Sequence, residues 1–490
     1  MARAGRYNLF FHAPAAAPNG GRATTEITRR LAKFVAGTAY DTLPEAVVAR
    51  VPTLVTDLIG IAVRARHAAE STPSLLAAVG RLGLGQGRAG VIGDAARLAP
   101  PAAALVNGTL AHSLDFDDTH TRGSIHPSAP IVPAALAAAG MTGAGGRALI
   151  AGIVAGYEVQ IRLSLALGPT EHYRRGFHPT ATCGAFGAAA AASRVFGLSA
   201  DAVADAFGIA LSQAAGSLQF LVDGAWTKRF QVGQAAMNGL IAASLAREGF
   251  HGAVAPIEGK AGFLNAYSPC PVPERAIDGL GETYETLAIG VKPYPSCRYS
   301  HAALDALIGL RAAHRIEPAE IEAVEIGLPQ TGWELVGDPI DAKRRPRNVV
   351  DGQFSMPFLA AVALRQGSMG WDDYARHLGD PATLALCRRV TCIVDPRAEA
   401  EFPRQMSGAA RVRTARGTFE AFVAVPAGEP DKFPAPAALR AKFAGLVAPY
   451  LSPRRIDALA AACESLATAE DIGALLRLTC PDRVASAAAS

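Results

Sequence analysis

The sequence predicts a mainly α-helical chain that carries a smaller α+β insert, and three observations support this prediction. Half of the 490 residues are apolar but only 7% are aromatic. The apolar side chains are therefore mostly Ala, Leu and Val, a composition that favours closely packed helices. From residue 24 to about residue 270, apolar residues recur at spacings of three and four. Beyond about residue 285, short alternating segments of strand type appear.

The helical predictions follow this apolar spacing along the chain. Thr24 or Thr25 is a suitable N-cap for the first helix, because Glu26 then falls in the first turn, where the helix dipole favours an acid. Ser199 is a suitable N-cap for a later helix. The predicted helical segments before the insert are 24–38, 43–65, 101–116, 147–167, 182–198, 199–216 and 231–250.

The insert combines strands and helices. Residues 321–329 and 390–396 predict strands, and residues 411–426 predict a hairpin around a glycine-containing turn. Helices are expected at 301–314 and 356–367, and the tail is helical again over 436–467. The length exceeds that of one usual core, so two domains are the default. The predicted divisions are 1–285 (helical), 286–426 (α+β) and 427–490 (helical return).

Composition excludes several classes of protein. The net charge is only +4, from 47 basic and 43 acidic residues, so we expect no nucleic-acid partner. The seven cysteines are scattered without a C-x-x-C pair, which predicts reduced thiols rather than a disulfide framework. The first 21 residues lack a continuous apolar segment of signal-peptide length, and residues 127–146 are too rich in Gly and Pro for a bilayer span. We therefore expect a cytoplasmic protein without a membrane partner.

The stretch HSLDFDDTH, which begins at His112, concentrates two histidines and three aspartates. If the preceding helix continues to near Asp118, then His112, Asp115 and Thr119 share one helical face through their i, i+3, i+7 spacing. The stretch is then a capped and solvated helix end, an acid/base site or a metal site. A magnesium site of the terpene-synthase type needs a third acid where Thr121 stands, which argues against a metal.

Other candidate residues lie in His-Pro pairs and cationic segments. Proline disfavours helical geometry at the residue before it, so His126 and His178 should each stand in an extended or turn conformation just before a helix of small residues. The N–H groups of such a helix can bind a carboxylate. Lys228 either extends from a buried helix toward water or holds a substrate carboxylate. The loop KPYPSCRYSH (292–301) gathers cations, a thiol and a histidine at the domain change.

Six blocks, in this order and spacing, resemble the MmgE/PrpD family from about residue 25 to 450. They are NGTLAHSLDFDDTH, IHPSAPIVPAALA, GYEVQIRL, GFHPTATCGAFGAAAAASRVFGLS, TKRFQVGQAAMNGLIAASLAREGF and KPYPSCRYSH. Members of this family dehydrate 2-methylcitrate, decarboxylate cis-aconitate or epimerise iminodisuccinate. The resemblance implies a large all-α domain formed by both ends of the chain, a smaller α+β lid domain, a homodimer, and a reaction that needs no metal and no organic cofactor.

The resemblance also implies the site residues. It places in the active cleft Asp115, Thr119, His126, His178, Lys228 and Lys292. Cys297, followed by Arg298, stands where cis-aconitate decarboxylases have a histidine. His301, four residues after Cys297, is a second candidate for that place and an expected substrate-binding residue. The loop between Thr119 and His126 is one residue longer than in that enzyme.

The family's reactions can pass through a carbanion or enolate-like species beside a carboxylate or imine. Such a site needs cations to hold carboxylates, a base that titrates near neutral pH, and a proton donor on the other face. We expect Lys228 and Lys292, aided by Arg298, to bind the carboxylates. His126 or His178 is the expected base, because imidazole titrates near neutral pH.

The remaining residues complete the expected chemistry. Asp115 would orient a histidine or act as a base itself, and Thr119 would donate a hydrogen bond to the substrate. Cys297 would transfer a proton on the opposite face, because neighbouring cations lower a thiol pKa. The sequence thus predicts a cofactor-independent hydro-lyase for a small di- or tricarboxylate. The alternatives are an iminodisuccinate-type epimerase, a cis-aconitate-type decarboxylase and a non-enzymatic helical dimer that binds a metabolite.

Overall fold

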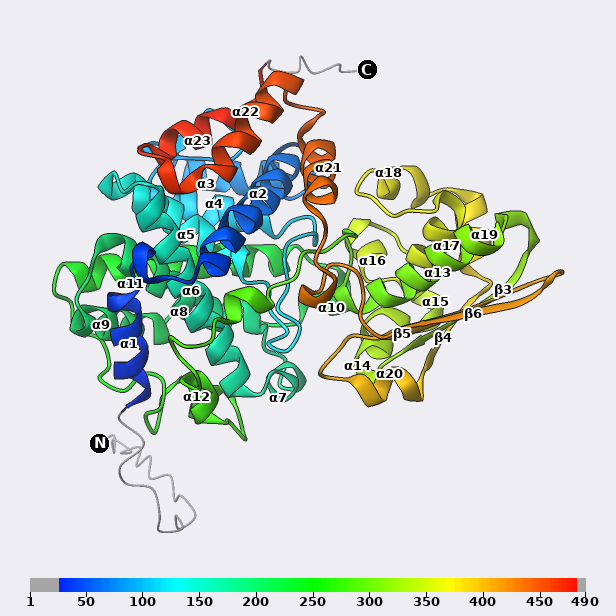
Figure 1. Cartoon of the computed structure of the whole chain (residues 1–490), viewed down its shortest axis with the longest axis horizontal. Helices are drawn as coiled ribbons and strands as arrows, with labels where there is room; N and C mark the ends of the chain where they lie inside the picture. Colours follow the sequence, from blue (N-terminus) through cyan, green and yellow to red (C-terminus); the bar gives the residue numbers. More distant parts are fainter. Residues whose placement is uncertain (1–25, 483–490) are drawn as a thin grey trace, which may run out of the picture.

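The N-terminal half of the chain forms a bundle of helices, so the prediction of a mainly α protein is confirmed (Figure 1). The computed structural model describes residues 26–482. The helices of this half are α1 Ile27–Gly37, α2 Glu45–Ala68, α3 Thr72–Arg81, α4 Pro100–Ala111, α5 Ser128–Thr142, α6 Gly146–Leu167, α7 Pro169–Arg174, α8 Pro179–Phe196, α9 Ala200–Leu211, α10 Phe220–Asp223, α11 Thr227–Arg247 and α12 Phe263–Tyr267. Two short strands, β1 Ala89–Gly90 and β2 Arg97–Leu98, pair between α3 and α4.

The predicted helix starts can be compared with the structure at two places. Ser199 caps α9 as predicted, because its hydroxyl accepts a hydrogen bond from the Ala202 amide. Thr24 and Thr25 lie outside the described residues, and Glu26 occupies the N-cap position of α1 without a side-chain hydrogen bond.

Small residues let the central helices approach one another closely. A Cβ atom added at Gly233 of α11 would lie 2.3 Å from the Leu105 carbonyl oxygen and 2.2 Å from Thr109 Oγ1, both on α4. One added at Gly239 would lie 2.4 Å from Ala188 Cβ on α8. Any side chain at these glycines would push the helices apart, which is the physical reason for the Ala- and Gly-rich composition.

The end of the chain packs on its beginning. Helices α21 Pro436–Val447, α22 Pro453–Glu464 and α23 Ile472–Leu478 share one apolar core with α2, α4 and α5. At the closest approach of α21 to α2, a Cβ atom added at Gly60 would lie 2.9 Å from the Phe443 ring. Figure 1 shows α21, in orange, beside the blue helix α2.

Between these two helical parts, the chain forms a separate core around one sheet. The strands are β3 Ile321–Leu328, β4 Val390–Val394, β5 Gly408–Thr414 and β6 Gly417–Val423, in the order β4-β3-β5-β6. Val324 of β3 pairs with Val390 of parallel β4 and with Val412 of antiparallel β5. The predicted strands and hairpin are therefore confirmed, whereas the division points after residues 285 and 426 stay predictions.

Helices of this region cover the sheet, and α13 packs on β5 and β6. They are α13 His301–His314, α14 Gln330–Gly332, α15 Ile340–Lys343, α16 Val349–Gln353, α17 Met356–Gln366, α18 Asp373–His377, α19 Pro381–Cys387 and α20 Pro396–Glu401. A π-helical turn spans Trp333–Gly337. Within residues 26–482, the 3₁₀ turns are Tyr40–Thr42, Pro273–Ala276, Glu285–Ala288, Arg298–Ser300, Pro318–Glu320, Pro430–Lys432 and Leu466–Thr468.

Two helices, α2 and α6, are long and apolar enough to cross a membrane. Within the protein, 61% of the apolar window of α2 and 89% of that of α6 are buried. Such burial is what the core helices of a large helical domain show.

The close contact at Gly233 leads to a stability prediction. We expect Gly233→Ala to lower the free energy of unfolding by about 1–3 kcal/mol, because the added methyl group overlaps backbone atoms of α4. Gly140→Ala in α5 is the matched control, since nothing lies within 4 Å of its added Cβ. That change should stabilise the protein by roughly 0.5–1 kcal/mol through helix propensity. Urea unfolding followed by circular dichroism measures both, and equal effects of the two substitutions would contradict the packing argument.

Candidate active site

A pocket lies where the helical part of the chain meets the α+β part. It encloses about 620 Å³ that no protein atom fills, including the space at its mouth. The predicted site residues that line it are Asp115, Thr119, His126, His178, Lys228, Lys292, Cys297 and Arg298. His301 does not line it. The structure therefore gathers all but one of the predicted residues around a single space.

The helix before HSLDFDDTH ends earlier than the sequence suggested. Helix α4 ends at Ala111, and Asp115 has a φ of +50°, in the left-handed region. The prediction of a helix that continues to near Asp118, with His112, Asp115 and Thr119 on one face, is wrong, because a left-handed residue cannot extend a right-handed helix. The alternative of a solvated helix end is wrong as well, since every residue from 112 to 121 is buried.

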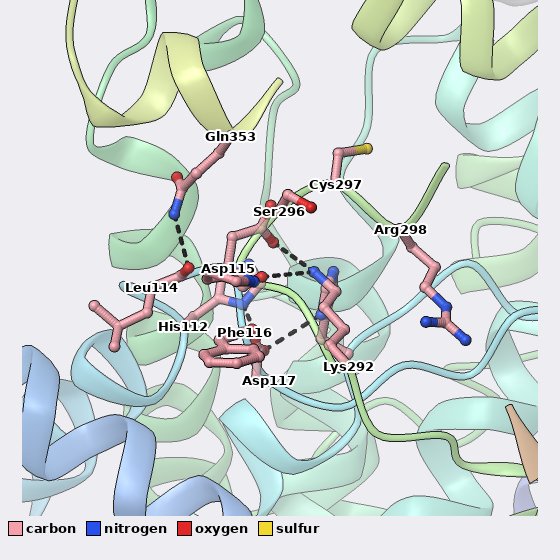
Figure 2. A network of polar contacts seen from close by, with 12 residues as sticks. His112, Leu114, Asp115, Phe116, Asp117, Lys292, Ser296, Cys297, Arg298 and Gln353 are labelled. Atoms are coloured by element: carbon pink, nitrogen blue, oxygen red, sulfur yellow. Dashed lines mark hydrogen bonds and ion pairs between the residues drawn. The ribbon is translucent and has the colours of Figure 1, made fainter. Parts of the chain in front are cut away.

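Asp115 binds two lysines. Its Oδ1 atom lies 2.7 Å from Lys228 Nζ, at the start of α11, and 2.8 Å from Lys292 Nζ. Figure 2 shows Lys292 pointing at Asp115 from the chain segment that leads into the α+β part. Burial alone would raise the pKa of Asp115, but the two ammonium groups outweigh it and hold this pKa well below its ordinary value. The pocket therefore contains one fixed carboxylate and two fixed cations.

Three histidine rings lie together beside this carboxylate. The ring centroid of His112 is 4.7 Å from that of His126 and 5.9 Å from that of His178. His112 Nδ1 donates to Asp117 Oδ2 over 2.7 Å, and His126 Nδ1 lies 3.4 Å from the same oxygen. Burial is the largest cause of the lowered pKa of all three histidines, and the pKa of His112 falls to about 4. The rings are therefore neutral at neutral pH.

The hydrogen bond of His178 fixes which of its nitrogens carries the proton. His178 Nδ1 donates to Gln231 Oε1 over 3.1 Å, which leaves Nε2 as the unprotonated nitrogen. As predicted from the His-Pro pairs, helix α8 starts at Pro179 directly after His178, and α5 starts at Ser128, two residues after His126. Each proline thus places its histidine at the start of a buried helix.

Asp118 supports the start of α5. Its Oδ1 accepts from the Ser128 amide over 3.1 Å, and its Oδ2 accepts from the Ser128 hydroxyl. Burial raises the pKa of Asp118 to about 8, although the bonds from Ser128 oppose this rise. This aspartate thus holds the helix that presents His126 and does not line the pocket itself.

Among the described residues, one group of side chains could also hold a metal ion, and it consists of His112, Asp117 and His126. Their ligand atoms all lie within 4.8 Å of one another. His112 Nε2, Asp117 Oδ1 and His126 Nδ1 are buried and have no hydrogen-bond partner among the described residues. The direct bond from His112 to Asp117 gives the three groups an alternative role, in which the carboxylate orients the two rings.

The α+β part contributes Cys297 and Arg298 to the lining of the pocket. Burial raises the pKa of the Cys297 thiol, and the nearby Asp115 charge adds to this rise. The expectation that cations lower this pKa is therefore wrong, because desolvation outweighs Lys292 and Lys228. Arg298 is committed to Glu429, to which its Nε and Nη2 donate over 2.9 and 2.6 Å.

His301 lies behind Arg298 rather than in the pocket. Its Nδ1 is 2.8 Å from Arg298 Nη1, and its Nε2 faces Ser296. Burial first and the neighbouring Arg298 second hold the pKa of His301 well below its ordinary value. The fully buried ring can support Arg298, but the prediction that it binds substrate is not matched by its place.

Sequence reasoning missed most of the other lining residues. They include Tyr173, Tyr299, Phe220, Leu221, Phe354 and Met406. Burial raises the pKa of Tyr173 above its ordinary value, so its phenol stays protonated. Tyr173 stands five residues before His178, and Tyr299 stands within KPYPSCRYSH, so proximity to those motifs was the available signal. The apolar lining residues belong to no motif, so no signal in the sequence pointed to them.

Comparison with known proteins supports the resemblance seen in the sequence. The MmgE/PrpD N-terminal domain matches residues 29–276, and the MmgE/PrpD C-terminal domain matches residues 294–466. The cis-aconitate decarboxylase-like protein oryM of Aspergillus oryzae is 29% identical over 423 residues, which cover 80% of this chain and 85% of that protein. Cis-aconitate decarboxylase of Aspergillus terreus is 29% identical over 397 residues (75% and 78%), and that of Homo sapiens is 30% identical over 285 residues (56% and 57%). The chain belongs to the MmgE/PrpD family.

Proposed function

We propose that this protein is a hydro-lyase that acts on a small di- or tricarboxylate through an enolate-like intermediate. The observation that carries this proposal is the convergence of Lys228 and Lys292 on Asp115, in a pocket that also holds neutral histidines. Membership of a family with decarboxylase relatives supports lyase chemistry, and the relatives' substrate, cis-aconitate, suggests a tricarboxylate. We further propose that the protein is a cytoplasmic homodimer and that its reaction needs no metal and no organic cofactor.

The two lysines can bind a substrate carboxylate while they keep Asp115. An ammonium group has three N–H donors. Lys228 donates to Asp115 Oδ1, and Lys292 donates to Asp115 Oδ1 and to its backbone oxygen. Each lysine therefore retains a donor for a ligand. Because the pocket is largely buried, these charges stabilise negative charge on a carboxylate more strongly than they would in water.

The histidines and the thiol supply the proton transfers. A neutral His178 or His126 takes the proton from the carbon beside a carboxylate, and the electron pair moves onto that carboxylate as an enolate. The enolate then expels a hydroxyl group from the next carbon. That group leaves as water with a proton from a donor elsewhere in the pocket. Cys297 fits this task because its raised pKa keeps the thiol protonated.

Decarboxylation is the second candidate, and the names of the relatives favour it. Loss of carbon dioxide from a substrate such as cis-aconitate leaves an allylic carbanion, which needs a proton donor but no base. The pocket is lined both by neutral histidines that can act as a base and by the Cys297 thiol that can act as a donor, and elimination of water requires such a pair. An epimerase would use the same pair without losing a group.

The reaction class is predicted to show in deuterium incorporation. Purified protein is incubated in D2O with citrate, 2-methylcitrate, cis-aconitate and iminodisuccinate, and the products are analysed by mass spectrometry. We expect addition of water to place one deuterium at the carbon beside a carboxylate, elimination of water to place none on its product, and EDTA to have no effect on either. Release of carbon dioxide would establish the decarboxylase, and exchange without net conversion would indicate an epimerase. Binding of these carboxylates without turnover or deuterium exchange would contradict the proposal that the protein is an enzyme.

Removal of one cation should disable the site without unfolding the protein. We expect Lys228→Met to lower kcat/KM by about 10²–10³-fold, because a positive charge that faces the developing enolate is lost. Lys260→Met is the matched control, since Lys260 is exposed and outside the pocket. Steady-state kinetics with circular dichroism of both variants tests this, and a Lys228→Met enzyme with unchanged kcat/KM would exclude Lys228 from the reaction.

The pH dependence should report the neutral histidines. Burial lowers the pKa of His126 and His178 from the ordinary value of 6.5, so the base stays unprotonated as the pH falls through 6.5. We expect the acid limb of kcat/KM, which reports the free enzyme, to lie below pH 6.5. A limb centred at or above this value would contradict a buried histidine base. His178→Gln and His126→Gln identify which of the two rings is the base. The variant that lacks the base should no longer show the fall of kcat/KM at acid pH.

A further inference from the structure

Three consecutive backbone carbonyls of the turn at Asp115 each accept a hydrogen bond from a buried side chain. Gln353 Nε2 donates to the Leu114 oxygen over 2.7 Å, as Figure 2 shows. Lys292 Nζ donates to the Asp115 oxygen, and Lys442 Nζ donates to the Phe116 oxygen, each over 3.0 Å. The three donors come from α16, from the segment before the 3₁₀ turn at 298–300, and from α21 near the end of the chain.

The turn needs such support because its conformation is unfavourable. A non-glycine residue with φ near +50° carries backbone strain of about 1–3 kcal/mol and persists only where its surroundings fix it. Buried carbonyls must also find donors. Among the described residues, no backbone N–H donates to the carbonyls of Leu114, Asp115 and Phe116, and side chains donate to them instead. The lysine contacts of Asp115 are possible only while this turn is held.

Lys442 is itself held in place by an ion pair and by an aromatic ring. Its side chain is 11% exposed and pairs with Asp57 of α2, whose Oδ1 lies 2.7 Å from Nζ. Lys442 Nζ also lies 3.9 Å from the centre of the Phe116 ring. Neither Lys442 nor Asp57 lines the pocket, so neither can touch a substrate there. Lys442 contacts the turn at Phe116, and Asp57 contacts Lys442.

We propose that Gln353 and Lys442 are positioning residues that hold the left-handed turn at Asp115 and so set the geometry of the proposed lyase site. This inference rests on the proposed function for its kinetic test. Gln353 also ties the turn to the Cys297 backbone, because its backbone oxygen accepts from the Cys297 amide over 3.0 Å. The turn, the backbone at Cys297 and α21 are therefore linked by hydrogen bonds.

The test replaces the buried pair as a whole. Lys442→Met combined with Asp57→Leu removes both charges, which avoids leaving one of them buried alone. We expect kcat to fall about 10–100-fold while KM changes less than about threefold, since a shifted turn misaligns the reacting groups but leaves the ammonium groups to bind carboxylate. Arg440→Met is the matched control, because Arg440 ties the same helix to Asp457 of α22 without touching the turn. It should leave kcat within about twofold.

Gln353→Leu provides an independent variant if the double variant does not fold, and the same fall in kcat is expected of it. A folded variant that keeps kcat within twofold would overturn the proposal. Crystal structures of the wild type and of either variant separate this outcome from failure of the proposed function. If the wild type neither turns over the carboxylates nor binds tricarballylate by calorimetry, the proposed function fails. The positioning role is then still decided by whether Asp115 leaves the left-handed region in the variant.

Discussion

The site depends on one buried carboxylate whose charge is balanced by two lysines. An isolated carboxylate in a protein interior costs several kcal/mol, so Asp115 is tolerable there only with Lys228 and Lys292 in place. Such buried ion clusters contribute little net stability, which points to function as the reason for keeping one. Here the carboxylate keeps two ammonium groups fixed, poorly hydrated and directed at one pocket.

Much of the fold was predictable because the patterns were long and local. Apolar spacing located helices such as α6 and α11, and alternation located β3 and the β5–β6 hairpin. The end of α4 was not predictable in this way, since residues 112–118 have a helical spacing too. Helix α4 ends at Ala111, and the left-handed turn at Asp115, which is held by side chains from positions 292, 353 and 442, prevents the helix from resuming. Contacts that distant leave no trace in local spacing.

The polar site residues were predictable because motifs with family-specific order carried them. The protonation states were not, because they depend on burial. Adjacent cations in the sequence suggested an acidic thiol at Cys297, yet desolvation raises its pKa. Likewise, the place of His301 four residues after Cys297 suggested that it binds substrate. The short turn at 298–300 instead directs its ring behind Arg298. The apolar wall formed by residues such as Phe354 and Met406 has no motif at all.

The packing of α21 on α2 has a consequence for biosynthesis. Protein synthesis runs from the N-terminus, so α2 is made long before residues 436–447 exist. Until then, the apolar surface of α2 around Gly60 lacks its cover, and Asp57 lacks the cation that neutralises it. A ribosome-bound chain that has already completed the sheet still exposes this surface, and transiently exposed apolar surface of this kind promotes aggregation. The support that Lys442 gives to the turn at Asp115 can therefore form only after α21 has been made.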